Sequence, residues 1–156
     1  MQIRRFRSED APALARLYHE AVHRVGAVHY TPEQVRAWSP AVPDEAGFRA
    51  RGGDGRLLLV AVDGEGEPLA YGDVEADGHI GHLYCRPDVA GSGITAALYD
   101  RLEAEARRQG IERLYVEASE PARRFFTRRG FSVLHRRDFQ LRGVAIHNYA
   151  MEKRLV

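Results

Sequence analysis

Hydrophobic positions near the start of the chain follow the period of a helix after one short strand. Residues 3–7 predict the strand. Residues 8–10 are of types that cap helices, and Gly26 is of the type that ends them. Between them, apolar side chains recur at helical spacing, at Leu14, Leu17, Tyr18, Ala21, Val22 and Val25. We therefore expect a first helix that reaches Gly26.

Two shorter helices should follow. Residues 31–34 read TPEQ, a capping box with proline at the first helical position, and predict a helix that carries Trp38. Asp44 can cap one more helical turn that reaches Phe48. A glycine-rich stretch over residues 51–55 then separates these helices from the middle of the chain.

The middle of the chain has the pattern of strands. Residues 57–62 are a short, continuous apolar run, which is typical of a buried strand. Residues 69–75 and 79–85 predict two further strands, which follow turns at residues 63–66 and 77–78. Because both turns are short, we expect the three strands to be antiparallel neighbours.

The last part of the chain alternates between helices and strands. Residues 94–110 have helical spacing, residues 114–116 predict a strand, and residues 121–130 predict another helix. Two strands, over residues 131–140 and 144–151, close the chain. This order of elements indicates an α/β domain with a mixed sheet.

Length and cysteine content limit the class of protein. A chain of 156 residues is the size of one domain, so we expect a single domain over residues 1–156. Its one cysteine, Cys85, can form no internal disulfide, and no spacing of ligands predicts a metal site. The chain has no secretory signal pattern and no apolar run of roughly 20 residues. We expect a cytoplasmic protein with no metal and no membrane partner.

The charges are balanced but unevenly placed. The formal net charge is +1, which does not indicate a nucleic-acid binder. Acidic residues dominate residues 63–77, whereas arginines crowd residues 101–142. That basic stretch could meet a phosphorylated ligand, and it keeps an arginine-rich nucleic-acid binder open as an alternative. Our own expectation is that no nucleic acid binds.

A glycine-containing turn joins the strand at residues 79–85 to the next helix. Gly91 and Gly93 allow backbone N–H groups to converge there, and the helix N-terminus adds partial positive charge. Such a turn can cradle a pyrophosphate. The alternative is an ordinary connection whose glycines only relieve steric crowding.

The same turn fits a second nucleotide pattern. Residues 91–96 read GSGITA, which matches the dinucleotide pattern G-x-G-x-x-G/A, and Glu117 lies where a ribose-binding acid would be. The context does not fit, because three antiparallel strands precede the turn. Too little chain follows it to build a parallel six-stranded sheet.

The stretch from Leu83 to Phe131 resembles the GNAT superfamily of acetyl-CoA-dependent N-acetyltransferases. The family's turn, Q/R-x-x-G-x-G/A, falls on residues 90–95, which read AGSGIT. Gly93 matches the pattern, whereas Ala90 and Thr95 depart from its first and last positions. The family's helix N-x-x-A-x-x-F-Y-x-x-x-G-F falls on residues 119–131. The resemblance implies a mixed, mostly antiparallel sheet of about six to seven strands flanked by about four helices.

The resemblance also implies which residues contact acetyl-CoA, the cosubstrate. The contacts come from the strand, the turn and the second helix: Leu83, Tyr84, Cys85, Ala90, Gly91, Ser92, Gly93, Ile94, Thr95, Ser119, Phe125 and Phe126. Ser119 replaces the family's asparagine, and Phe126 replaces the tyrosine that often protonates the leaving thiolate. A phenyl ring cannot donate a proton, so another group must fill that role.

In such folds two neighbouring strands splay apart and the pantetheine arm lies between them. The strands here are residues 83–85 and 114–116, and a backbone N–H near Tyr84 would polarise the thioester carbonyl. The acceptor is a primary amine of a small molecule or peptide, which attacks directly after losing a proton.

Histidine suits the role of the base, and two histidines lie on the strand that would carry the thioester. His79 takes the place where some members keep a glutamate, and His82 faces the other side unless a bulge intervenes. Asp73 and Glu75 on the preceding strand are rivals, although each reads more simply as a solvated hairpin charge.

Other roles fall to aromatic residues and to one amide. Tyr84 and Tyr149 are candidates for the acid. Residues 30–38 resemble a bacterial subgroup with Y-S/T-P-E-Q-x-x-A-W, and they lie where the family builds its acceptor pocket. We therefore expect acceptor contacts from Tyr30, Gln34, Trp38, Asp73 and Glu75. Cys85 has no neighbour that would activate it as a nucleophile.

One further alternative function and the state of assembly remain open at this point. The changes at Ala90 and Phe126 are compatible with a catalytically idle module that only binds acyl-CoA. Strand edges after Val144 also make a homodimer a possibility to be tested.

Overall fold

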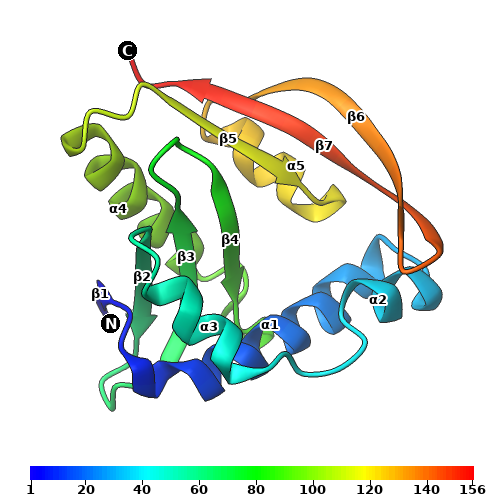
Figure 1. Ribbon diagram of the computed structural model, residues 1–156, viewed down its shortest axis with the longest axis horizontal. Helices are drawn as coiled ribbons and strands as arrows, with labels where there is room; N and C mark the ends of the chain where they lie inside the picture. Colours follow the sequence, from blue (N-terminus) through cyan, green and yellow to red (C-terminus); the bar gives the residue numbers. More distant parts are fainter.

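The computed structural model describes residues 1–156 and contains two sheets that meet at one end (Figure 1). The first sheet has the order β1-β2-β3-β4, and all neighbours are antiparallel. Its strands are β1 (Gln2–Arg5), β2 (Leu57–Val62), β3 (Pro68–Val74) and β4 (Ile80–Cys85). The three middle strands were predicted as antiparallel neighbours, and the structure confirms this.

Helices cover both faces of the first sheet. On one face lie α1 (Ala11–Val25) and α3 (Glu45–Gly52), and on the other lies α4 (Ile94–Arg108). Strand β2 alternates between them: Leu58, Val60 and Val62 pack toward α1, whereas Leu57, Leu59 and Ala61 pack toward α4. Both faces of β2 are therefore buried, which explains its continuous apolar sequence.

The second sheet has the order β5-β7-β6 and is also antiparallel. Its strands are β5 (Arg113–Ala118), β6 (Ser132–Leu141) and β7 (Val144–Arg154), and α5 (Glu120–Arg128) packs against β5 and β7. Strand β7 lies in the middle of this sheet. The expectation of an exposed strand edge after Val144 is therefore wrong, because β7 is paired on both sides and β6 forms the outer edge of the sheet.

Five α-helices and seven strands make up the fold, and the fifth helix is α2 (Pro32–Trp38). The expected capping box of α2 is present, since the Thr31 and Gln34 side chains bind each other's backbone N–H groups. Ser8–Asp10 forms a 3-10 turn, and Asp10 does not cap α1 with its side chain. Its carboxylate instead accepts hydrogen bonds from Arg4 and from the Arg7 N–H. No helix is long and apolar enough to span a membrane.

Strands β4 and β5 touch at one end and then diverge. A single parallel bridge joins His79 to Tyr115, where the Tyr115 N–H donates to the Gly78 carbonyl at 3.1 Å. Gly78 has φ +97°, and a Cβ there would lie 1.9 Å from the Arg113 carbonyl oxygen, so only glycine permits this contact. Beyond the bridge, β4 and β5 share no ladder, and the space between them is the opening that the rest of the site uses.

The hairpin of β6 and β7 arches across this opening and reaches α2 (Figure 1). Arg142 at its tip donates to the Ala37 carbonyl at 2.6 Å, and Gln34 donates to the Ala145 carbonyl at 3.0 Å. These contacts connect the second sheet to the helices of the first sheet, on the side opposite the His79 bridge.

Candidate active site

A groove of about 310 Å³ runs from the glycine turn along β4 to α5. We call it the glycine-turn groove. Its walls come from α1, β4, the turn and α5 and include Val22, Trp38, Leu83, Tyr84, Cys85, Ala90, Gly91, Thr95, Ser119, Ala122, Phe125 and Phe126. The residues expected to contact acetyl-CoA all line this groove, apart from Ser92, Gly93 and Ile94 in the turn beside it.

The turn itself presents free backbone donors. Gly91 and Gly93 have φ values of +79° and +92°, and Gly93 holds the N-cap position of α4 without any side-chain cap. The first helical bond of α4 is donated by Ala97, so the preceding N–H groups have no partner in the helix. The Ser92 hydroxyl does not cap the helix but donates to the Val89 carbonyl at 2.6 Å. The turn can therefore hold a phosphate with backbone groups alone.

One edge of β4 also presents free donors. The Arg86 N–H donates to the Leu69 carbonyl, and Tyr71 lies opposite Tyr84, so the backbone groups of Tyr84 and Arg86 face β3. The N–H groups of the alternate residues, Leu83 and Cys85, therefore point away from β3 into the opening toward β5. No strand pairs with this edge.

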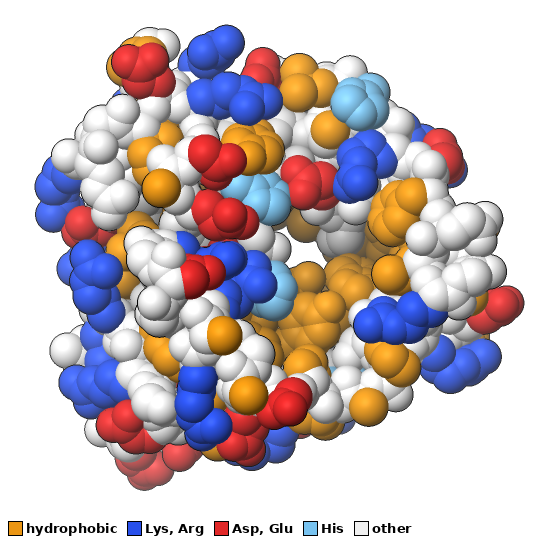
Figure 2. Space-filling view, viewed as in Figure 1, with side chains coloured by type: hydrophobic (Ala, Val, Ile, Leu, Met, Phe, Trp, Pro, Cys, Tyr) orange, Lys and Arg blue, Asp and Glu red, His pale blue; other side chains and the backbone are white.

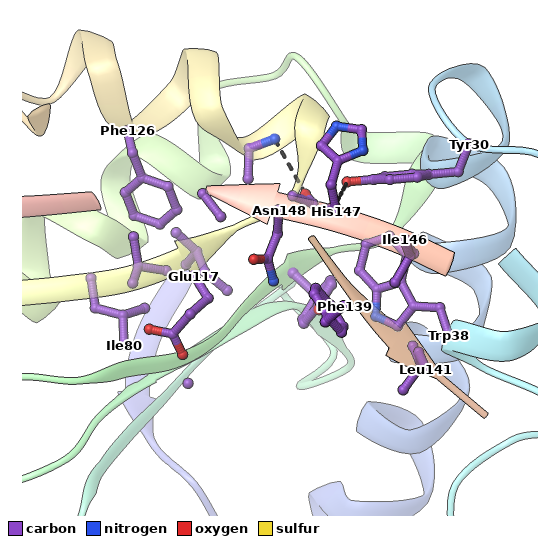
Figure 3. Close-up of a pocket in the computed structure, with 17 residues that line it drawn as sticks. Tyr30, Trp38, Ile80, Glu117, Phe126, Phe139, Leu141, Ile146, His147 and Asn148 are labelled. Carbon is purple, nitrogen blue, oxygen red and sulfur yellow. Dashed lines mark hydrogen bonds between the residues drawn. The ribbon is translucent and has the colours of Figure 1, made fainter. Parts of the chain in front are cut away.

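A second cavity, of about 160 Å³, lies where β4 and β5 have separated, under the β6–β7 hairpin. We call it the splay cavity (Figure 3). Its apolar walls include Ile80, Val116, Phe139, Leu141 and Ile146. It shares Trp38, Leu83, Tyr84, Ser119, Ala122 and Phe126 with the glycine-turn groove, so the two spaces meet at that wall.

Two polar side chains point into the splay cavity in Figure 3, namely Glu117 from β5 and Asn148 from β7. The Glu117 carboxylate binds His79 Nε2 at 2.8 Å, and the Asn148 Oδ1 accepts from Arg137 at 3.1 Å. Neither residue was expected in an acceptor site, and Glu117 was noted only for the dinucleotide pattern. The signal in the sequence was strand alternation, since Leu114, Val116 and Ala118 are buried and Glu117 lies between them.

His79 is held between two carboxylates and does not line either space. Its Nδ1 lies 2.9 Å from Glu75 and its Nε2 lies 2.8 Å from Glu117, while the ring stacks on Tyr115. Burial lowers the pKa of His79, but hydrogen bonds to Glu75 and Glu117 outweigh it and leave the pKa raised. Both ring nitrogens are engaged, so the expectation that His79 acts as the base does not fit. Glu75 serves as its partner, outside the splay cavity.

A bulge in β4 turns His82 toward α1 and α3. Gly72 pairs with Leu83 but Val74 pairs with Ile80, so Gly81 and His82 together face Asp73. The His82 ring stacks on Tyr18 and its Nδ1 lies 2.9 Å from the Tyr71 hydroxyl. Burial, followed by the positive charge of Arg51, lowers the pKa of His82 to about 3. His82 is therefore neutral near pH 7 and is a weak base.

Asp73 fills the bulge and is completely buried, so its reading as a solvated hairpin charge is wrong. Its Oδ1 accepts from the N–H groups of Gly81 and His82 at 3.0 and 3.3 Å. Its Oδ2 accepts from Arg51 at 2.6 Å, and Arg56 lies 3.4 Å from Oδ1. Asp73 cannot contact an acceptor directly and instead supports the backbone of β4.

The two tyrosines considered as acids lie in different places. Tyr84 lies on the wall that joins the glycine-turn groove to the splay cavity, and burial raises its pKa, which keeps the phenol protonated. Tyr149 lines neither space. Its hydroxyl donates to Glu120 at 3.0 Å and its ring packs under Arg123. The structure therefore does not bring the Tyr149 hydroxyl into either space.

Tyr30 and Trp38 line the splay cavity, as expected of an acceptor site. The Tyr30 hydroxyl donates to the His147 carbonyl at 3.1 Å and accepts from the Glu120 N–H at 2.8 Å. The rings of Tyr30 and Trp38 meet edge to face. Gln34 lies outside the cavity, where its amide holds β7 through the Ala145 carbonyl.

Comparisons with known proteins agree on one family. Residues 27–153 match the model of the acetyltransferase (GNAT) domain. A solved GCN5-related N-acetyltransferase from Rhodopseudomonas palustris, described as an aminotransferase of class II, is 34% identical with a TM-score of 0.90, over 99% of this chain and 95% of its own. The uncharacterised N-acetyltransferase YafP of Escherichia coli is 25% identical over 97% of this chain and 94% of its own.

A further solved structure supports the fold alone. The PaiA N-acetyltransferase of Thermoplasma acidophilum, in complex with coenzyme A, is 18% identical with a TM-score of 0.77, and the match covers 98% of each chain. Together with the match to the family model, these comparisons show that the chain belongs to the GNAT family of acetyl-CoA-dependent N-acetyltransferases.

Proposed function

We propose that this protein transfers the acetyl group of acetyl-CoA to a primary amine of a small molecule or peptide, by direct attack within a ternary complex. One observation carries the proposal. The free N–H groups of the turn and of β4 border one groove, and that groove opens into a cavity holding a carboxylate. A donor and an acceptor can therefore meet at the wall formed by Leu83 and Tyr84.

Acetyl-CoA fits the glycine-turn groove by its chemistry. The unpaired N–H groups at the start of α4 suit the pyrophosphate. The free edge of β4 suits the amide-rich pantetheine arm, which can pair with it as an added strand does. The N–H groups of Leu83 and Cys85 can then donate to the thioester carbonyl as negative charge develops on its oxygen.

Proton removal falls to Glu117 in this proposal. A primary amine with a pKa of about 10 is mostly ammonium near pH 7 and must lose a proton before it attacks. Glu117 is the acidic side chain that lines the splay cavity. His79, at the end where β4 and β5 are joined, binds its carboxylate and fixes its orientation. The carboxylate can accept the proton directly or through a water molecule.

Proton return to the leaving thiolate falls to Tyr84. Phe126 is buried and has no proton to donate, and Tyr149 is turned toward Glu120. Tyr84 is the phenol on the wall that both spaces share, and it stays protonated because burial raises its pKa. The chain thus supplies both proton transfers without the usual tyrosine of the family's second motif.

Titration calorimetry with acetyl-CoA, followed by a thiol-release assay over a panel of amines, tests the proposal. We expect saturable acetyl-CoA binding, no NADH binding, and thiol release with at least one amine. Binding without turnover of any amine would favour the alternative of an idle acyl-CoA-binding module, which the absence of a tyrosine at Phe126 motivates. Binding of NADH would contradict the assignment of the turn.

The Gly93→Val variant sharpens that test. A side chain at φ +92° is strained and would fill the open space beside the backbone donors, so we expect acetyl-CoA affinity to fall by at least about tenfold. Gly55→Val is the matched control, because Gly55 has φ +94°, lies in an open turn and borders neither space. Normal affinity in a folded Gly93→Val protein would refute the placement of the pyrophosphate.

A further inference from the structure

A third cavity, of about 460 Å³, opens on the other side of Trp38 and has no role in the proposed function. We call it the arginine cavity. It lies between α1, α3, the bulge of β4 and the tip of the β6–β7 hairpin, and its lining includes Tyr18, Trp38, Pro43, Phe48, Arg51, His82 and Arg142. Figure 2 shows a hollow at the centre of the molecule, with hydrophobic side chains in its floor and basic, acidic and histidine side chains around its rim.

The Arg51 guanidinium is held by the protein at one nitrogen only, and its other two nitrogens are accessible. Its Nε donates to the buried Asp73 at 2.6 Å, whereas its two terminal nitrogens have no partner within the protein. Those nitrogens are not buried, since no buried polar side-chain atom lacks a partner. A guanidinium held in this way presents a flat pair of donors, which is the geometry that matches a carboxylate.

Gly81 brings this guanidinium close to the acceptor site. A Cβ on Gly81 would lie 2.3 Å from the terminal Nη2 of Arg51, so the glycine leaves room for the guanidinium against the backbone of β4. Gly81 also lines the splay cavity. Arg51 therefore lies at the boundary between the arginine cavity and the space where the amine would react.

The charges around the arginine cavity favour an anion. Arg142 reaches it from the hairpin tip, held by one hydrogen bond to the Ala37 carbonyl. Asp44 is the one acidic residue in the lining, against Arg51 and Arg142, and its carboxylate accepts a hydrogen bond from the Ala46 N–H at the start of α3. Burial, followed by the positive charge of Arg51, lowers the pKa of His82, so His82 is neutral and adds no charge of its own.

We propose that the acceptor is an amine that also carries a carboxylate, which binds Arg51 and Arg142 in the arginine cavity while the amine lies in the splay cavity beside Trp38. This inference rests on the proposed function and adds the class of acceptor to it. The fork of Arg51 binds the two oxygens, and Arg142 adds a second positive charge from the hairpin. Arg51 and Arg142 then determine specificity, whereas Glu117 and Tyr84 act on the reacting atoms.

Binding can be measured without turnover, because Trp38 is the one tryptophan in the chain and lines the arginine cavity. The probes are α- and ω-amino acids from glycine to 6-aminohexanoate, each paired with its carboxamide, titrated at low salt without acetyl-CoA. We expect a saturable change in Trp38 fluorescence with at least one amino acid. Its carboxamide should bind at least about tenfold more weakly. Added salt should weaken binding of the amino acid but not of its carboxamide.

Variants locate the binding. Arg142→Gln should lower the affinity for the amino acid by at least about tenfold. Arg51→Lys should lower it as well, because lysine keeps the charge but loses the paired donors of the guanidinium. Arg49→Gln is the control, because Arg49 lies on the same helix, pairs with Glu45 and does not line the cavity. Arg142→Gln keeps the test valid if a change at Arg51 prevents folding, since Arg142 has no contact with Asp73.

Equal affinity for acids and carboxamides would overturn the proposal. So would the absence of a saturable change with every amino acid up to about 50 mM, beyond the millimolar range of weak binding. Acetyl-CoA titrated into the same preparations reports on the proposed function separately. Loss of acetyl-CoA binding would contradict the donor groove, and loss of amino-acid binding alone would contradict only the carboxylate site.

Discussion

At the scale of single residues, hydrogen-bond partners decide which titratable groups can act on an acceptor. His79 and His82 were both reasonable bases in the sequence, yet each is committed to other contacts. His79 lies between two carboxylates, and His82 is neutral in the floor of the arginine cavity. Glu117 remains as the acidic group that reaches the splay cavity.

Glu117→Gln tests this assignment. The amide keeps the shape but cannot accept a proton, so we expect kcat to fall by about 10²-fold or more, as for the loss of a general base. Acetyl-CoA affinity should not change, because Glu117 does not line the glycine-turn groove. Glu112→Gln, at an exposed position just before β5, should leave both quantities unchanged. A Glu117→Gln enzyme with normal kcat would remove Glu117 from the reaction.

The ion pairs of His79 with Glu75 and Glu117 should make the stability of the protein depend on pH. The pKa of His79 is raised in the folded protein, so its contribution to stability is complete below its unfolded pKa of about 6.5. That contribution is lost as the pH rises through the folded pKa. Urea denaturation from pH 6 to 9 should show a smaller decline for His79→Gln than for the native protein. His135→Gln, at an exposed position, is the control variant. An equal decline in His79→Gln and the native protein would contradict a stabilising role for the His79 ion pairs.

At the scale of elements, the important feature is that β4 and β5 are joined at one end only. The bulge opposite Asp73 and the close contact at Gly78 set where the joining stops. The free N–H groups of β4 follow from register, because they alternate with those that bind β3. Sequence patterns predicted both strands, but their divergence was expected only from the family resemblance, because it depends on contacts between distant segments.

Hydrogen exchange at β4 can test the donor assignment directly. We expect acetyl-CoA to slow exchange of the Leu83 or Cys85 amide, since at least one of these two amides should donate to the pantetheine arm. The Tyr84 amide already faces β3 and should change much less. Residue-resolved NMR with and without acetyl-CoA measures all three amides. Equal protection of all three, or of Tyr84 alone, would show that the arm does not pair with this edge.

Tyr30 connects three elements through its hydroxyl, since it binds His147 of β7 and the first N–H of α5 from the loop before α2. Tyr30→Phe should lower the free energy of unfolding by about 1–3 kcal/mol, the range for two part-buried hydrogen bonds. Urea denaturation measures this loss. Tyr115→Phe removes an exposed hydroxyl bond to Asp77 and should cost less. Equal losses in the two variants would mean that the Tyr30 bonds add nothing beyond an exposed contact.

At the scale of the whole molecule, the arginines of residues 101–142 do not form a free basic surface. Arg113 binds Glu152, Arg123 binds Glu120, Arg129 binds Asp100 and Arg136 binds Asp138. These pairs neutralise much of the stretch that kept a nucleic-acid binder open. The absence of nucleic-acid binding remains a prediction.

A salt titration on immobilised DNA tests it. We expect weak retention whose dependence on salt is shallow, because few unpaired cations are available to displace counterions from phosphates. The isolated stretch is not a useful comparison, since its neutralising acids come partly from β7 and α4. Tight retention with a steep salt dependence would revive the alternative.

The sequence by itself determined the elements and the family. Its apolar periods marked the buried strands and helices, and the glycine turn and the Phe125–Phe126 helix carried the resemblance that the family match confirms. Local chemistry suffices for these, since caps, turns and periodicity depend on residues near one another. Tertiary structure alone decided the site. Burial placed Asp73 beneath β4, ion pairing occupied His79, and a bulge turned His82 and left room for Arg51 beside Gly81. Such roles depend on partners far away in the chain, whose distance and desolvation no local pattern encodes.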